Sequence, residues 1–215
     1  MNQDRTGPED QDRAPALEES WAIITEQQQR VRDTLRVDDR VVYTTWGVAW
    51  GVGYLAMYVS ADGADGRPGT AGAITFGLLI TAAIAVTIVH AVLRTGGMGG
   101  RQARMDAMLG AAWSVGFLAV FAVFAGVGRA GFEGPAAGIV YNALPCLVVA
   151  GNFMGAGAAW DDRRQFRLGV WIAAVVAAAS LVGGRELYLV MAVLGGGGFL
   201  VAAALDVRAR LRRAS

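Results

Sequence analysis

Long apolar stretches fill most of this chain, and short polar segments separate them. A helix needs about 20 mostly apolar residues to cross a hydrocarbon core of about 30 Å. Six stretches reach or approach that length, at residues 41–60, 71–93, 107–128, 136–160, 168–182 and 188–205. The pattern predicts an all-α membrane protein, with six transmembrane helices arranged as three hairpins over residues 41–205.

The last two stretches are the shortest, and only residues 183–187 separate them. One re-entrant hairpin is therefore an alternative to two crossings. We favour two crossings, because a slightly thinned bilayer accommodates a short helix at modest cost.

The polar segment before the first stretch has two parts. Residues 1–14 are acidic and polar, and we expect them to be disordered. In residues 15–38, apolar side chains recur at steps of three and four, which predicts an amphipathic cytoplasmic helix. Its apolar seam needs a partner surface, which is the bilayer, the underside of the helix bundle or another protein. We expect a protein partner or a second copy of the chain, because acidic residues near the start of the helix would be repelled by anionic lipid. The candidate contact residues are Trp21, Ile24, Val31 and Leu35.

Arginines flank the predicted spans unevenly. Sixteen lie before the first span or after the second, fourth and sixth spans, whereas three lie in the other connections, at Arg67, Arg129 and Arg185. The positive-inside rule then places both termini in the cytoplasm, and an even number of spans agrees with that placement. The basic tail, residues 206–215, is expected to face anionic lipid head groups. Its arginines are Arg208, Arg210, Arg212 and Arg213.

The composition of the chain excludes several kinds of catalytic and metal site. Hydrophobic residues make up 54% of the chain and charged residues 17%, whereas soluble domains carry roughly 25% charge. The net charge of +1 gives no pull toward nucleic acid. There is no lysine for a Schiff base, and one histidine and one cysteine form neither a two-histidine metal site nor an intrachain disulfide. We expect no cofactor, no metal and no catalytic residue.

Polar side chains within the predicted spans are few, and none near the middle of a span is charged. Asn142 and Cys146 share one face of the fourth span, and Asn152 lies on another face. An amide in lipid needs a partner, so either asparagine bonds a neighbouring helix or contacts a substrate. His90, near the end of the second span, is either an interfacial residue or a pH switch. These four residues are the candidates for a polar pathway or for packing.

Aromatic residues form a stripe on the first span, where Trp46, Trp50, Tyr54 and Tyr58 follow at steps of four. The stripe is expected to pack against lipid or another helix, and the alternative is an aromatic-lined path.

Small residues predict close helix contacts at Gly47 with Gly51 and at Gly151 with Gly155. The run at residues 195–198 is expected to pack closely too, and the alternative is a broken helix beside a cavity.

An internal repeat links the first and third spans. Residues 49–58 and 112–121 are identical at six of ten positions. If the unit is a two-span hairpin, its copies run in parallel about an axis along the membrane normal.

The motifs Glu18-Glu19-Ser20, Glu26-Gln-Gln-Gln-Arg30 and Trp46-Gly-Val-Ala-Trp50 resemble multi-span membrane proteins of actinobacteria, as does the segment at residues 188–199. The resemblance implies a membrane fold over most of the chain, and it carries neither an activity nor site residues.

Three functions fit these patterns. The heptad helix and the uncharged spans favour a non-catalytic accessory, assembly or sensing component. The repeat, the glycine run and the polar groups of the fourth span favour a small permease or channel for a neutral or weakly polar solute. A membrane-embedded enzyme comes third, because the sequence has no catalytic dyad or nucleophile motif.

Overall fold

The computed structural model describes residues 20–23, 39–61, 66–95 and 100–214. The chain divides into two compact units, Met1–Val37 and Asp38–Ser215. In the first unit, residues 20–23 are helical and Trp21 is exposed. The other predicted contact residues, Ile24, Val31 and Leu35, lie outside the described residues.

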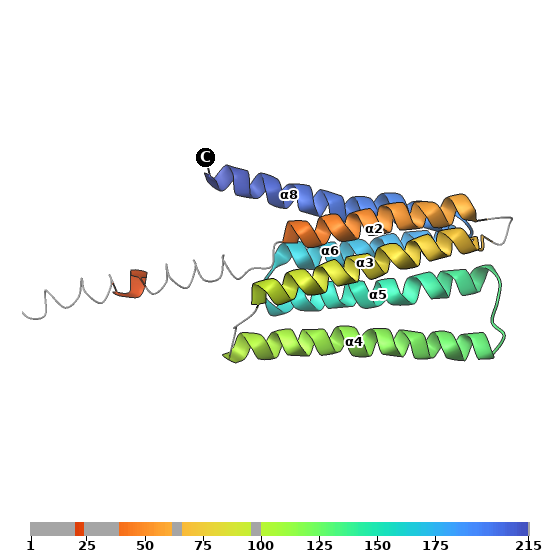
Figure 1. Cartoon of the computed structure of the whole chain (residues 1–215), viewed down its shortest axis with the longest axis horizontal. Coiled ribbons are helices and arrows are strands. Elements are labelled where there is room, and N and C mark those ends of the chain that lie inside the picture. Colours follow the sequence, from red (N-terminus) through yellow and green to blue (C-terminus); the bar gives the residue numbers. More distant parts are fainter. Residues whose placement is uncertain (1–19, 24–38, 62–65, 96–99, 215) are drawn as a thin grey trace, which may run out of the picture. The chain divides into compact units, whose positions relative to one another are not determined.

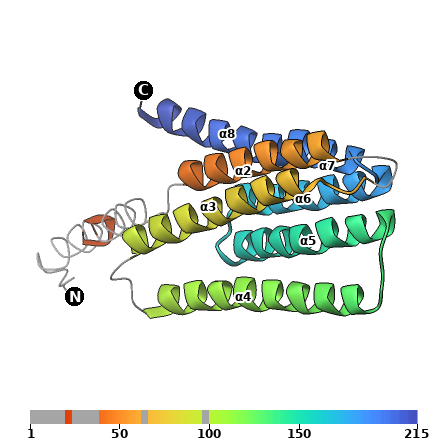
Figure 2. The same cartoon turned by 45° about the vertical axis from the view of Figure 1, so that its right-hand side comes forward.

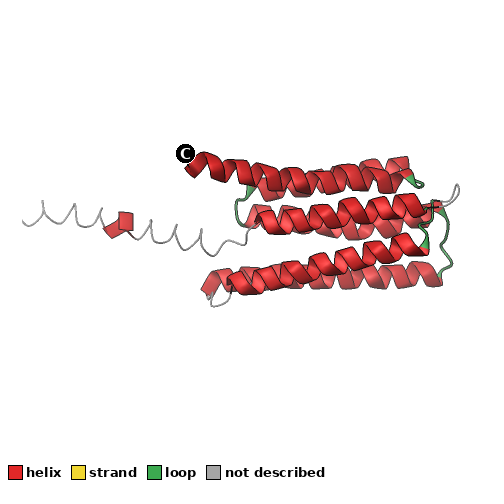
Figure 3. Ribbon diagram, turned by 45° about the horizontal axis from the view of Figure 1, so that its top comes forward, coloured by secondary structure: helices red, strands yellow, loops and turns green. Residues whose placement is uncertain are grey.

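The described elements of the second unit are all helices (Figures 1 and 3). They are α2 (Asp39–Ser60), α3 (Thr70–Thr95), α4 (Gly100–Arg129), α5 (Pro135–Ala159), α6 (Arg163–Val182), α7 (Glu186–Val190), the π-helix η1 (Met191–Gly196) and α8 (Gly197–Ala214). Each predicted stretch overlaps one of these helices, the last one overlapping the continuous run α7–η1–α8. The all-α prediction is therefore confirmed for the described residues.

Among the described residues, five helices are long and apolar enough to cross a membrane: α3, α4, α5, α6 and the run α7–η1–α8. The length of α6 and of the following run supports two helices there rather than one re-entrant hairpin. Helix α2 has 22 residues, which is also a spanning length, but it begins with two charged residues and is rich in aromatic residues and glycine. The chain thus has the character of a multi-pass membrane protein, and the sixth crossing stays a prediction.

Helix α2 packs along α3 and also along η1 and α8, while α5 packs along α6. Large apolar side chains from α6, α7, η1 and α8 are fully buried between these helices, namely Phe199, Ile172, Leu187, Met191 and Val176. Helix α4 packs mainly on α5 and lies at the edge in two views (Figures 1 and 2). Only 6% of the spanning part of α3, and of α4, is buried, so most of their apolar surface is available to lipid.

The helices alternate in direction, which brings alternate connections together. At one end, Arg67 Nη2 lies 3.1 Å from Glu133 Oε2, and the Arg185 guanidinium lies 4.4 Å from the centre of the Tyr58 ring. At the other end, Arg164 of α6 pairs with Asp206 of α8. The connections with few arginines therefore meet at one end of the second unit, as the positive-inside argument requires.

The first glycine pair makes the close contact that we predicted. A Cβ atom on Gly196 would lie 2.6 Å from the backbone N of Gly51 and 3.0 Å from the carbonyl oxygen of Gly47. Neighbouring backbones can approach this closely only where side chains are absent. The contact joins α2 to the end of η1.

The predicted contact at the second glycine pair is wrong. A Cβ atom on Gly151 or Gly155 would meet nothing within 4 Å. Helix α5 instead approaches α6 through Ala150, because a Cβ on Gly169 would lie 2.8 Å from its carbonyl oxygen. The four-residue spacing marks a narrow face, but a neighbour must lie on that face for a contact to form.

The glycine run at residues 195–198 does not break the last helix. The chain continues without interruption from α7 through η1 into α8. The glycine run therefore begins in a wider π-helical turn and continues into an α-helix. The indole Nε1–H of Trp171, on α6, donates a hydrogen bond of 3.0 Å to the carbonyl oxygen of Leu194 in η1. The close-packing interpretation of this run is therefore correct.

Candidate functional site

Three buried polar side chains form a cluster between α2 and α5. The Tyr54 hydroxyl, on α2, donates a hydrogen bond of 2.7 Å to Asn142 Oδ1 and lies 3.4 Å from Cys146 Sγ. Asn142 and Cys146 lie one turn apart on α5 and therefore share one face, as their spacing predicted, and both face the Tyr54 hydroxyl. Asn142 is 7% exposed, and Tyr54 and Cys146 are 3% exposed. The buried asparagine thus bonds a neighbouring helix.

Only the oxygen of the Asn142 side-chain amide accepts a hydrogen bond from the described part of the protein, and its nitrogen is not used. Its Nδ2 is buried and has no hydrogen-bond partner among the described residues. A buried donor without an acceptor costs about 1–3 kcal/mol, so such groups in native proteins need an explanation. The cluster therefore combines a tie between two helices with one unused donor.

Aromatic rings surround the cluster. The Tyr54 ring lies 4.8 Å from Phe76, 5.7 Å from Trp50 and 6.5 Å from Tyr188, measured between ring centroids. Trp50 is 3% exposed, so this part of the aromatic stripe packs in the core and faces neither lipid nor an open path. Apolar rings exclude water, which strengthens the hydrogen bond between Tyr54 and Asn142.

The two ends of the stripe make polar contacts of their own. Trp46 Nε1–H donates to Thr87 Oγ1 at 3.0 Å and so links α2 to α3. Thr87 in turn donates to the Ala83 carbonyl of its own helix at 2.8 Å. Tyr58 lies beneath the Arg185 guanidinium in a cation–π contact. Helix packing, with polar links at each end, accounts for the whole stripe.

The other predicted candidates lie apart from this cluster. Asn152 Nδ2 donates to the Val148 carbonyl of its own helix at 2.9 Å, so this amide bonds within α5 rather than to a neighbouring helix of the described structure. His90 is half-buried in the last turns of α3, near the opposite end from the loop at Arg67. Sequence reasoning also missed Tyr54 as the partner of Asn142, although it singled out the stripe that contains Tyr54.

The arginine-rich tail continues α8 as a helix to Ala214. Arg208 and Arg212 are exposed along it, whereas the side chains of Arg210 and Arg213 lie outside the described part. No group of three or more histidine, cysteine, aspartate or glutamate side chains in the described ranges is arranged to hold a metal ion.

Two shallow hollows lie at the arginine-rich end, away from the buried cluster. One, of about 300 Å³, lies at the corner between α5 and α6, and the other, of about 290 Å³, lies between the start of α4 and the end of α5. The buried cluster therefore provides a hydrogen bond between helices. The surface at the arginine-rich end has two concave regions, one of which is lined by charged residues.

Comparison with protein-family models, with curated proteins and with solved structures gives no significant match.

Proposed function

We propose that the chain is a non-catalytic accessory, assembly or sensing component of a membrane. The observation that carries this proposal is the bond between Tyr54 and Asn142, which joins α2 and α5 inside a core of fully buried apolar side chains. Helices held in this way form a fixed platform. Around it, α3 and α4 expose apolar faces on which lipid or another membrane protein can pack.

The proposal includes six membrane crossings with both termini in the cytoplasm of a bacterial cell. Two observations support α2 as the sixth crossing: it has 22 residues, and it packs along α3 and α8, which both belong to helices long and apolar enough to cross a membrane. The uneven arginine distribution supports the orientation.

The proposed partner surface is the seam of residues 15–38. Trp21, Ile24, Val31 and Leu35 would contact a cytoplasmic protein or a second copy, since one helix cannot bury its own apolar seam. The arginines after residue 206 would hold the end of α8 at anionic head groups. The test is co-purification in mild detergent with the full chain, with Ile24→Asp and with residues 1–40 removed. Retention of the same associated protein by both variants would exclude this seam.

A small permease or channel for a neutral or weakly polar solute is the second candidate. The unused Nδ2–H donor of Asn142 favours it, because a buried amide donor suits a passing carbonyl or hydroxyl oxygen. An enzyme is the third candidate, and the described residues offer it no metal-holding group.

Solute flux separates the first two candidates. The full chain, reconstituted in liposomes, is exposed to a step in urea or glycerol, and swelling is followed by light scattering. The proposed function predicts the swelling rate of protein-free liposomes. A faster rate that Asn142→Leu abolishes and Asn152→Leu preserves would establish a permease instead, because Asn152 bonds its own helix.

A further inference from the structure

A groove of about 300 Å³ lies where α5 turns into α6. Its lining residues are Gly157, Ala158, Asp161, Arg163, Phe166 and Arg167. The candidate spans end at Ala159 and begin again at Arg163, so the groove lies where the chain leaves the apolar part of the bundle.

Hydrogen bonds and one glycine fix the backbone conformation where α5 turns into α6. The Asp162 N–H donates to the Gly157 carbonyl at 2.8 Å, and Asp162 Oδ1 accepts from the backbone N–H groups of Arg164 and Gln165 at 3.0 and 3.2 Å. Asp162 therefore caps α6. A Cβ atom on Gly157 would lie 2.5 Å from the backbone N of Phe166, so glycine is needed for α6 to start this close to α5.

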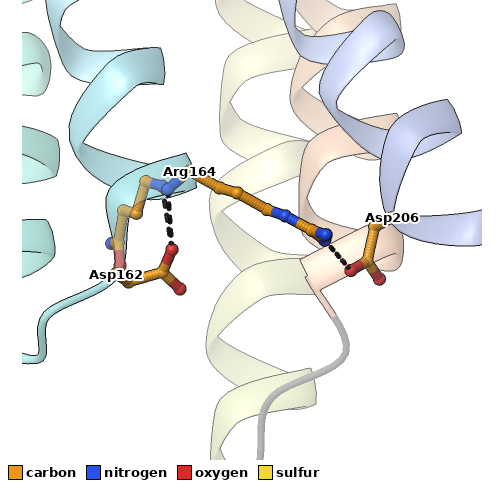
Figure 4. A network of polar contacts seen from close by, with 4 residues as sticks. Asp162, Arg164 and Asp206 are labelled. Carbon is orange, nitrogen blue, oxygen red and sulfur yellow. Dashed lines mark hydrogen bonds and ion pairs between the residues drawn. The ribbon is translucent and has the colours of Figure 1, made fainter. Parts of the chain in front are cut away.

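The three arginines at the start of α6 have different surroundings. Arg164 reaches across to α8, where its Nη1 lies 3.1 Å from Asp206 Oδ1 (Figure 4). Arg163 and Arg167 are exposed, line the groove, and form no ion pair with any residue that the structure describes. A spacing of four places both on one face of α6, so their guanidinium groups can converge on one anion.

An apolar ring completes the groove. Phe166 is 42% exposed and lines the groove together with these two arginines and the small residue Ala158. Asp161 supplies a carboxylate at the same place. The groove thus offers two cations, one hydrogen-bond acceptor and an apolar wall at the boundary of the spanning helices.

The geometry points to a binding site for an anionic phospholipid whose head group carries hydroxyls. Guanidinium groups pair with phosphate oxygens through paired hydrogen bonds, so Arg163 and Arg167 hold the phosphate. A head-group hydroxyl donates to the Asp161 carboxylate, and the acyl chain lies on Phe166 and Ala158. The carboxylate disfavours a second anion, which makes a glycerol head group a better fit than one bearing further phosphates.

The test is native mass spectrometry of the delipidated full chain in mild detergent, titrated with phosphatidylglycerol or with phosphatidylcholine of the same acyl chains. Tighter binding of phosphatidylglycerol is expected. Arg163→Gln and Arg167→Gln should each weaken it by roughly tenfold, the effect of losing one charge-assisted contact. Phe166→Ala should weaken both lipids.

Arg164→Gln is the matched control, because it removes the same charge from the same turn but from a side chain that faces Asp206. It should change the affinity by less than roughly twofold. Thermal unfolding of each variant in the same detergent verifies that it is folded. Equal weakening by all three arginine variants, or no preference between the lipids, would overturn the site. If excess inorganic phosphate displaces the lipid, then the groove binds phosphate and not specifically a phospholipid.

Discussion

The Tyr54 hydroxyl is the side-chain link between α2 and α5 on which the proposed platform depends. Tyr54→Phe would leave both ends of the buried Asn142 amide without a protein partner. We expect the free energy of unfolding to fall by about 1 kcal/mol, the scale of a hydrogen bond between membrane helices. Thermal unfolding in detergent measures the change.

Two controls belong to this experiment. Tyr58→Phe makes the same chemical change on the same helix, in a half-buried ring that contacts Arg185, and should cost less. Adding Asn142→Leu to Tyr54→Phe should restore part of the stability, because the stranded amide is then removed. Equal costs for the two tyrosine variants would contradict the role of the Tyr54 hydroxyl.

At the residue scale, sequence reasoning found one side of the cluster. Spacing placed Asn142 and Cys146 on one face of a helix, and the structure agrees. It did not find Tyr54, because periodicity identifies the face of a helix and not the helix that lies opposite. The bond from Trp171 to Leu194 was missed for a further reason: its acceptor is a backbone carbonyl, which every residue has, so no residue type marks it in the sequence.

Gly196 and Gly197 test the packing of η1 against α2. The two glycines are adjacent, but a Cβ on Gly196 would lie 2.7 Å from the Gly51 Cα, whereas one on Gly197 would meet nothing within 4 Å. Gly196→Ala should therefore lower the thermal stability by about 1–3 kcal/mol, the usual cost of overpacking.

Gly197→Ala is the matched control and should be neutral or stabilising by up to about 1 kcal/mol, because alanine is the better helix former. Stability that is unchanged in both variants would show that α2 and η1 are farther apart than described.

Gly151→Leu tests whether the face of α5 at Gly151 is free of helix contacts. The added side chain meets open space, so stability should change by less than about 0.5 kcal/mol. Val149→Leu, in the same helix, enlarges a side chain that is 5% exposed and should cost about 1–3 kcal/mol. If unfolding in detergent shows that Gly151→Leu costs more stability than Val149→Leu, then Gly151 does lie in a close helix contact.

At the element scale, apolar length was enough to locate the helices, because a helix is the structure in which one long apolar segment satisfies its backbone hydrogen bonds by itself. It did not predict that α7 would continue through a π-helix into α8. The spacing of small residues predicted a close helix contact correctly at Gly51 and wrongly at Gly151. Spacing describes one helix, whereas contact depends on which neighbours the whole bundle brings to it.

In the second unit as a whole, the helices have unequal surroundings. Trp50 and Tyr54 are buried, but the matching positions of the repeat, Trp113 and Phe117, are half-buried on α4, which packs mainly on α5. Similar sequence therefore does not give equivalent packing. The sequence alone could not reveal this, because both segments have the same apolar pattern and differ only in their neighbours.

The number of membrane crossings is tested most directly by the membrane topology of the full chain, because α2 is the crossing that separates six spans from five. Reporter domains that are active on only one side of the membrane are fused after Arg40, at Asp65 and after Ser215. Six crossings with cytoplasmic termini predict cytoplasmic reporters at Arg40 and Ser215 and an external one at Asp65. If Arg40 and Asp65 report the same side, opposite to Ser215, then α2 does not cross the membrane and the six-span account is wrong.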